Sequence, residues 1–164
     1  MVDLIMDKKG MSERIPHGLK AIGPDGIISI DLEKKIAIGF KKITEEDCGY
    51  GAHFDSLKGL PLVVPGATLE EWGYQVGLVL LSGISGCQMA MPIKSTRINN
   101  KFVNVGDEII IKSKLVAKDP FEKYPKGNIE ITNEDSTVTY MTCSFTFKLV
   151  SCKVIKRLFP PIMV

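Results

Sequence analysis

The feature of this chain that most constrains its fold is a mostly apolar run over residues 67–81, which predicts one substantial α-helix. The run follows Pro65 and Gly66 and precedes Ser82 and Gly83, where we expect the helix to end. Because apolar side chains surround almost the whole helix, other elements must cover it on nearly every side. A curved antiparallel sheet wrapped around the helix would provide that cover.

Strand-like segments before and after the helix predict the sheet. Residues 27–30 and 35–41 are β-branched runs separated by a polar turn at residues 31–34, which predicts an antiparallel hairpin. Beyond the helix, turn residues separate four more strand-like runs, at residues 87–98, 108–118, 128–132 and 137–150. The last run alternates like a half-buried antiparallel strand, with one face made of Met141, Cys143, Phe145 and Phe147. The sequence therefore predicts an α+β fold with about six strands around one central helix.

The other segments predict irregular structure within a single domain covering residues 1–164. Prolines and glycines are frequent in residues 1–26, which predicts a largely irregular lead-in, with a short helix before Gly10 as an alternative. Residues 44–66 form a long loop, and loops of that length inside a compact domain are usually functional or disordered. Residues 153–164 form a C-terminal tail that either packs on the domain or lies free.

Composition narrows the class of protein and its partners. Apolar residues make up 45% of the chain and charged residues 24%, as in ordinary globular domains. A formal charge of +2, without clustered basic and aromatic residues, argues against a nucleic-acid partner. No segment approaches the roughly 20 apolar residues of a membrane-spanning helix, and no signal-peptide pattern is present. We therefore expect a cytoplasmic protein with no membrane association.

Cysteine and histidine usage argues against a metal site. The four cysteines are widely spaced and form no Cys-x-x-Cys pair, and the histidines are His17 and His53. In a reducing cytoplasm we expect the thiols to be free. These are Cys48, Cys87, Cys143 and Cys152.

A polar line crosses the apolar helix. The helical period places Thr68, Glu71 and Gln75 on one stripe, at spacings of three and four residues. A buried glutamate is costly unless it is paired or its pKa is raised, and perturbed carboxylates are typical of catalytic sites. The alternative is that Glu70 and Glu71 are first-turn acids favoured by the helix dipole. Adjacent helical residues point about 100° apart, so the two glutamates need not have the same role.

The long loop before the helix carries His53, which is a second candidate for chemistry. A lone loop histidine is more often structural or solvated than catalytic, so its interest lies in the combination with the downstream helix. Backbone N–H groups near Gly66 and Ala67, at the helix start, can polarise a carbonyl oxygen. A base, an oxyanion site and the acid Glu71 together suit proton abstraction next to a carbonyl, followed by loss of a β-substituent.

These residues resemble the signature of β-hydroxyacyl-acyl-carrier-protein dehydratases of the hotdog fold. In that family a His-Phe pair precedes a Pro-Val-Met-Pro-Gly segment, a catalytic Glu or Asp follows the glycine by five residues, and often a Gln comes four residues later. The matching residues here are His53-Phe54, Pro61-Leu62-Val63-Val64-Pro65-Gly66, Glu71 and Gln75. Weaker similarity extends over roughly residues 15–150, in Ile15-Pro16-His17, Lys101-Phe102 and Val105-Gly106-Asp107.

The resemblance implies a role for each matching residue. His53 would remove the α-proton of a β-hydroxyacyl thioester, and Glu71 would protonate the departing hydroxyl or hold the water that it becomes. The Gly66 N–H would bind the thioester oxygen, and Ala67 and Gln75 would complete the substrate-binding residues. To act as an acid Glu71 needs a raised pKa, which burial can provide. The family's chemistry requires no cofactor and no metal.

The resemblance also implies partners. The substrate would be carried by an acyl carrier protein or by CoA, in fatty-acid or related lipid biosynthesis. Family sites combine His and Glu from different protomers, which implies a homodimer, with a trimer of dimers as a larger option. Either of two basic groups could dock an acidic carrier, or could simply be solvated: Lys94, Arg97 and Lys101, or Lys153, Lys156 and Arg157.

Departures from the family pattern keep two alternatives open. The spacing between His53 and Pro65 exceeds the family's by four residues, with an insertion at residues 55–60, and Trp72 stands where a small residue is usual. One alternative is a hotdog acyl thioesterase. The other is a non-catalytic accessory protein that binds acyl thioesters.

Overall fold

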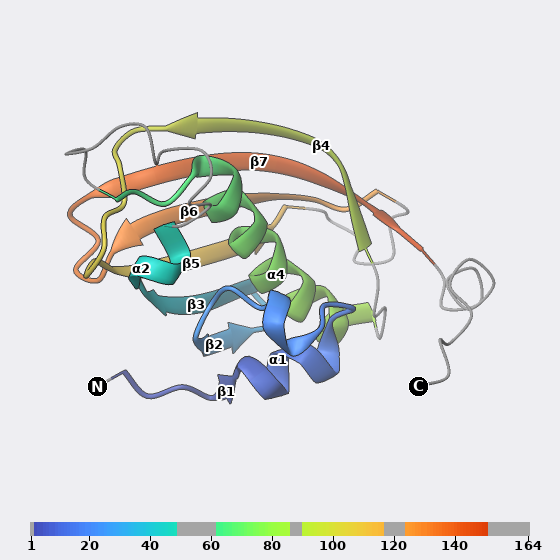
Figure 1. Ribbon diagram of the computed structural model, residues 1–164. Helices are drawn as coiled ribbons and strands as arrows, with labels where there is room; N and C mark the ends of the chain where they lie inside the picture. The colour runs from blue at the N-terminus through green and yellow to red at the C-terminus, as the bar shows by residue number, and fades with distance from the viewer. Residues whose placement is uncertain (1, 49–61, 86–89, 117–123, 151–164) are drawn as a thin grey trace.

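The computed structural model describes residues 2–48, 62–85, 90–116 and 124–150, and these form an antiparallel sheet curved around one long helix, α4 (Gly66–Ser85) (Figure 1). The sheet has seven strands in the order β1-β2-β3-β5-β6-β7-β4. The predicted α+β architecture is confirmed. The strands are β1 (Met6–Asp7), β2 (Gly26–Asp31), β3 (Ile36–Lys42), β4 (Ala90–Asn99), β5 (Glu108–Leu115), β6 (Lys126–Asn133) and β7 (Thr139–Leu149).

Local sequence patterns account for most of the strand pairing. Strands β2 and β3 form the predicted hairpin, with Asp31 opposite Ile36 and Lys35 in the left-handed region at φ 56°. Strand β7 pairs with both β6 and β4, and its predicted apolar face is buried against α4. That face includes Met141, Cys143, Phe145 and Phe147, each almost completely buried.

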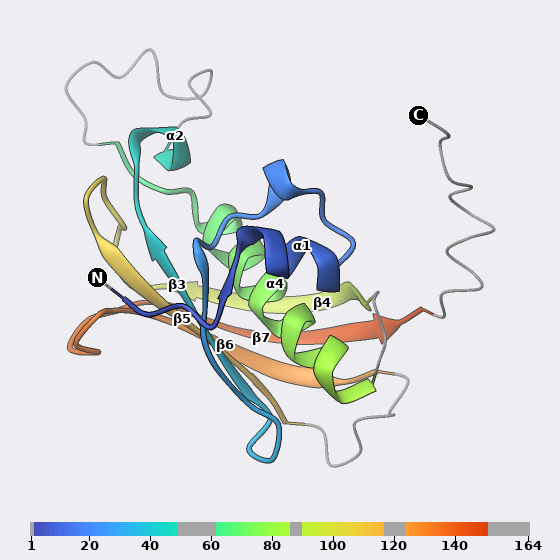
Figure 2. The ribbon, with the colours of Figure 1, turned by 90° about the horizontal axis from the view of Figure 1, so that it is seen from below.

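Helix α4 is buried over most of its length and lies close to the sheet (Figure 2). A Cβ on Gly73 would come within 2.5 Å of Ile129, and one on Gly77 within 2.7 Å of the Ser113 hydroxyl, so glycine permits this close approach. The predicted helix end at Ser82 and Gly83 is wrong, because α4 continues to Ser85. The hydroxyl of Ser82 donates to the Val79 carbonyl at 2.7 Å, three residues earlier in the helix, so this polar side chain has a partner without ending α4.

The lead-in is more regular than the sequence predicts. Helix α1 (Lys8–Arg14) runs through Gly10, where the alternative interpretation would end it, and is capped by Asp7, whose carboxylate accepts from the Gly10 N–H at 2.8 Å. A 3₁₀ turn, η1 (Leu19–Ala21), follows. Because Met11, Ile15 and Ile22 are almost fully buried, the lead-in is packed onto the core beside α4 (Figure 2).

Part of the predicted long loop is also ordered into a short helix, α2 (Glu45–Cys48). The carboxylate of Asp47 accepts from the backbone and the hydroxyl of Thr44, each at 2.8 Å, and pairs with the buried Lys41 ammonium at 3.0 Å. His53, the insertion at residues 55–60 and the tail at residues 153–164 lie outside the described residues. No helix in the described ranges is long and apolar enough to cross a membrane.

Candidate active site

The Glu71 carboxylate sits on the second turn of α4, under the lead-in rather than under the sheet. Its Oε1 lies 3.0 Å from Nε2 of His17 and 3.4 Å from Nε2 of Gln75, so Glu71 and Gln75 share one face of the helix as their spacing predicts. The Glu71 side chain is 47% exposed and that of His17 is 25% exposed. The hydrogen bond from His17 lowers the pKa of Glu71 and outweighs the opposing effect of partial burial.

The expectation that burial raises the pKa of Glu71 is therefore wrong for the single chain. The physical reason is its position on the helix: Glu71 points outward from the core, beside an imidazole, and not into the apolar layer between helix and sheet. In the single chain Glu71 is an ionised hydrogen-bond acceptor near neutral pH.

Gln75 fixes the lead-in to α4. Its Nε2 donates to the Ala21 carbonyl and its Oε1 accepts from the Gly23 N–H, both at 2.9 Å, and the residue is 1% exposed. A carbonyl on one side and an N–H on the other determine the orientation of the carboxamide. Both polar atoms of the Gln75 carboxamide already have partners, in the backbone and in Glu71. Direct contact between Gln75 and substrate stays a prediction.

Trp72 fills the space between α4 and the lead-in near Gly23. It is almost fully buried, and a Cβ on Gly23 would lie 1.8 Å from its indole nitrogen, so only glycine fits there. On another side the Lys41 ammonium lies 5.8 Å from the ring centroid, a cation–π distance. Trp72, which departs from the family pattern, thus supports the segment that carries His17.

Glu70 faces the other way, into a polar cluster between α4 and the sheet. Its Oε2 is 2.7 Å from Nη1 of Arg97, its Oε1 accepts a hydrogen bond from the Tyr74 hydroxyl, and its side chain is 13% exposed. Burial tends to raise the pKa of Glu70, but hydrogen bonds from Ser95 and Tyr74 and the charge of Arg97 lower it. Burial also raises the pKa of the neighbouring Cys143 thiol, which therefore stays protonated.

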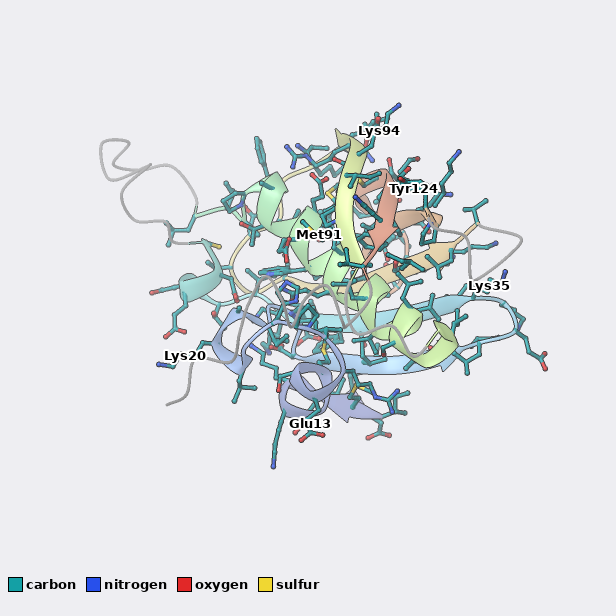
Figure 3. All side chains as sticks on the ribbon, turned by 90° about the vertical axis from the view of Figure 1, so that its right-hand side faces the viewer. Glu13, Lys20, Lys35, Met91, Lys94 and Tyr124 are labelled. Carbon is teal, nitrogen blue, oxygen red and sulfur yellow. The ribbon has the colours of Figure 1, made fainter. Side chains whose placement is uncertain are left out.

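This cluster includes one residue of a suggested carrier-docking group, and docking there stays a prediction. Arg97 is held by Glu70 against the helix and is not a free surface cation. Lys94, on the same strand, projects away from the body of the molecule (Figure 3). Lys153, Lys156 and Arg157 lie outside the described residues.

The helix start has the geometry of a candidate oxyanion site. The Pro65 carbonyl accepts from the amides of Thr68 and Leu69, at 2.9 and 3.2 Å. Within the described part of the chain the amides of Gly66 and Ala67 donate no hydrogen bond, as at the first turn of any helix. Their binding of a thioester oxygen stays a prediction.

Asn99, at the end of β4, is a polar neighbour of this helix start that the sequence pattern does not single out. A Cβ on Gly66 would lie 2.7 Å from the Asn99 amide nitrogen, so the two residues are in close contact. In the sequence Asn99 and Asn100 indicate only a turn. The alternation of β4 cannot reveal the contact, because it depends on how the sheet curves over the helix end.

Solved structures of other proteins share this fold. A dehydratase heterocomplex, ApeI:P from Xenorhabdus doucetiae, matches with a TM-score of 0.67 at 13% identity, covering 92% of this chain and 97% of that one. A hypothetical thioesterase with coenzyme A from Streptococcus pneumoniae matches with a TM-score of 0.65 at 13% identity, over 87% and 96%. Zebra fish thioesterase superfamily member 2 matches with a TM-score of 0.66 at 10% identity, over 87% and 93%.

The chain has the hotdog fold. No family model matches it, and no curated protein matches it in sequence. At such low identities the shared structure establishes the hotdog fold and leaves the chemistry to the residues of this chain.

Within the described residues the site therefore comprises a half-exposed carboxylate, one imidazole and a helix N-terminus. Glu71 and Gln75 are in contact on α4, the helix that begins at Gly66, and His17 joins Glu71 from the lead-in. No cluster of potential metal ligands occurs in the ranges that the structure describes. Such a set can accept a proton, hold a water molecule and polarise a carbonyl group.

Proposed function

We propose that this protein is an acyl-thioester enzyme, a β-hydroxyacyl thioester dehydratase that forms the trans-2-enoyl thioester. The observation that carries the proposal is the accessible Glu71 carboxylate, five residues after the glycine at the start of α4. The hotdog fold supports it, together with the His53-Phe54 and Pro65-Gly66 matches to the dehydratase signature.

In this mechanism His53 takes the α-proton while the bond between the β-carbon and its hydroxyl oxygen breaks. The enolate oxygen that develops is stabilised by the Gly66 and Ala67 amides. Glu71 gives its proton to the departing hydroxyl, which leaves as water. For that step Glu71 must be protonated, and covering its exposed half with a second subunit would raise its pKa because desolvation disfavours the carboxylate.

A homodimer is part of the proposal. Strand β4 pairs with β7 on one side, and its ten residues leave the other edge open among the described elements. Unpaired backbone groups along such an edge favour association with another strand. Met91, Ile93 and Ile98 are exposed there, and Met91 is visible in Figure 3. We propose that a second copy continues the sheet at β4; a trimer of dimers and a cytoplasmic location are further proposals.

The substrate carrier is proposed to be an acyl carrier protein or CoA. Neighbouring structures were solved with coenzyme A, in the pneumococcal protein, and with acetyl CoA, in smu.793 from Streptococcus mutans, which matches at 17% identity with a TM-score of 0.57 over 76% of this chain. These likenesses support a thioester whose carrier ends in a pantetheine arm.

A thioesterase is the second candidate, and the lowered pKa of Glu71 favours it. An ionised carboxylate beside a polarised thioester carbonyl can take a proton from an attacking water molecule. The carbon–sulfur bond then breaks, giving a carboxylic acid and a free thiol.

One assay separates these functions. Purified protein is incubated with β-hydroxybutyryl thioesters of CoA and of an acyl carrier protein, and enoyl formation and thiol release are followed in parallel. Enoyl formation that His53→Ala abolishes supports the dehydratase, whereas normal turnover by His53→Ala would exclude it. Thiol release without enoyl product selects the thioesterase, and tight binding without turnover selects a non-catalytic acyl-binding protein.

A further inference from the structure

We propose that His17 is a positioning residue for Glu71, which directs one carboxylate oxygen, Oε2, toward the substrate. The proposal rests on the proposed function in that Glu71 is the group that acts on the thioester. It concerns a residue of the lead-in, 54 positions before Glu71, that takes no direct part in the proposed chemistry.

The geometry determines which nitrogen of His17 carries the proton. A carboxylate can only accept, so the 3.0 Å contact requires Nε2–H of His17 to donate to Oε1 of Glu71. Nδ1 of the same ring is buried and has no hydrogen-bond partner in the described residues. With no donor or acceptor competing at Nδ1, Glu71 sets the tautomer.

Both contacts to the carboxylate use the same oxygen. His17 Nε2 and Gln75 Nε2 approach Oε1, at 3.0 and 3.4 Å, and within the described part of the chain no hydrogen bond reaches Oε2. The side chain is nevertheless 47% exposed. Oε2 is thus the oxygen left for a water molecule or a substrate hydroxyl.

The lead-in is anchored to the core on both sides of His17. Before His17 in the chain, Ile15 is buried in the core; after it, Gln75 holds the backbone of Ala21 and Gly23. The backbone that carries the ring is therefore anchored on both sides, and the contact that orients the ring itself is the one to Glu71. Because Nδ1 is buried, substrate cannot reach it, and this favours positioning over a direct role as base.

The test compares two substitutions that imitate different nitrogens of the ring. His17→Gln places an amide nitrogen near the position of Nε2 and can still donate to Oε1, whereas His17→Asn places one near Nδ1 and cannot. We expect His17→Gln to keep kcat within a few-fold of the wild type. His17→Asn and His17→Ala should lose roughly ten- to hundredfold in kcat, the range for one hydrogen bond to a charged group, with KM changed less than about twofold.

Melting temperatures of the three variants control for folding. Equal losses of kcat in Gln and Asn variants that melt like the wild type would overturn the proposal, as would full activity in His17→Asn. If His17→Asn melts early, the comparison is made at a temperature where both variants are folded, and the same two outcomes decide it.

A measurement without substrate separates this inference from the proposed function. The chain has two histidines, so a long-range proton–nitrogen NMR spectrum of His53→Ala contains the imidazole of His17 alone. We expect the tautomer protonated at Nε2, and loss of that preference when Glu71→Ala is added. The Nδ1-protonated form with Glu71 intact would overturn the pairing. If the wild type turns over no thioester, the proposed function fails while this spectrum still decides the pairing.

Discussion

Glu70 and Glu71 are neighbours in the sequence but belong to two different regions of the molecule. Glu70 faces the sheet, where Arg97 and Tyr74 occupy its carboxylate and leave it 13% exposed. Glu71 faces the lead-in, where His17 and Gln75 contact one oxygen and the side chain is 47% exposed. The pKa of each is lowered, so the pKa alone does not separate a structural carboxylate from a reactive one.

The two glutamates differ in the side chain that each contacts and in how far solvent reaches each carboxylate. Arg97 is a permanent cation, whose pairing with Glu70 joins β4 to α4. His17 belongs to the lead-in, which Gln75 fixes to α4 at Ala21, and its contact leaves one oxygen of Glu71 open. The closed pair therefore serves the fold, and the open one is suited to chemistry.

The largest expected effect is on turnover at Glu71. Glu71→Gln keeps the size of the side chain but removes the ionisable group, so we expect kcat to fall by about 10²–10⁴-fold, the usual contribution of an acid or base. Stability should change little, because the side chain is half-exposed. Rate measurements and urea unfolding check both points, and an active Glu71→Gln enzyme would remove Glu71 from the chemistry.

The second prediction concerns stability at Glu70. Glu70→Ala leaves the Arg97 charge without its carboxylate, and we expect the free energy of unfolding to fall by about 2–3 kcal/mol, below the roughly 3–5 kcal/mol of a fully buried pair because Arg97 is partly exposed. Chemical unfolding measures the loss. In the control, Arg97→Met combined with Glu70→Ala should destabilise less than the sum of the single changes; full additivity would mean that the pair makes no joint contribution.

A third, smaller effect is expected where the lead-in is fixed to α4. Gln75→Met keeps a similar volume but frees the Gly23 N–H and the Ala21 carbonyl, and should lower the free energy of unfolding by about 1–2 kcal/mol, since both hydrogen bonds are part-buried. Turnover should fall as well, because His17 loses the support of this segment. Unchanged turnover in a folded Gln75→Met protein would show that the lead-in does not position the site.

The smallest expected effect is in the pH dependence of stability. A carboxyl whose pKa is lowered on folding stabilises the folded state above its unfolded pKa, and that contribution is lost as pH falls through the folded pKa. For both glutamates the loss begins below the ordinary value of 4.5. The free energy of unfolding, measured from neutral to acidic pH, should depend on pH less in Glu70→Gln than in Glu71→Gln. Solvent screens the exposed Glu71, so removing its charge changes the pH dependence less. Equal pH dependence in the two variants would argue that the two environments do not differ.

The parts of the fold that follow a local period can be predicted from the sequence. Alternation in residues 137–150 identifies the buried face of β7, and the helical period places Glu71 in line with Gln75. The lead-in cannot be predicted in this way. Gly10 and the prolines disfavour helix in an isolated chain, and α1 forms because Asp7 caps it and Met11 is buried in the core.

Some residues of the candidate site can be found from the sequence and others only from the structure. The match to the dehydratase signature singles out Glu71, Gly66, Gln75 and His53, and the catalytic and substrate-binding roles of all four stay predictions. Folding of the chain adds His17 and Asn99, which reach the site from other elements. It also leaves Glu71 ionised and open, where the signature implies a buried acid.

The sequence by itself determined which faces of α4 and β7 are apolar and which of the two glutamates lies in line with Gln75, because backbone periodicity repeats over a few residues. Only the tertiary structure decided that His17 contacts Glu71 and that Arg97 contacts Glu70. Those contacts join segments 54 and 27 positions apart. They depend on how the lead-in and the sheet pack around one helix, and no local pattern records that packing.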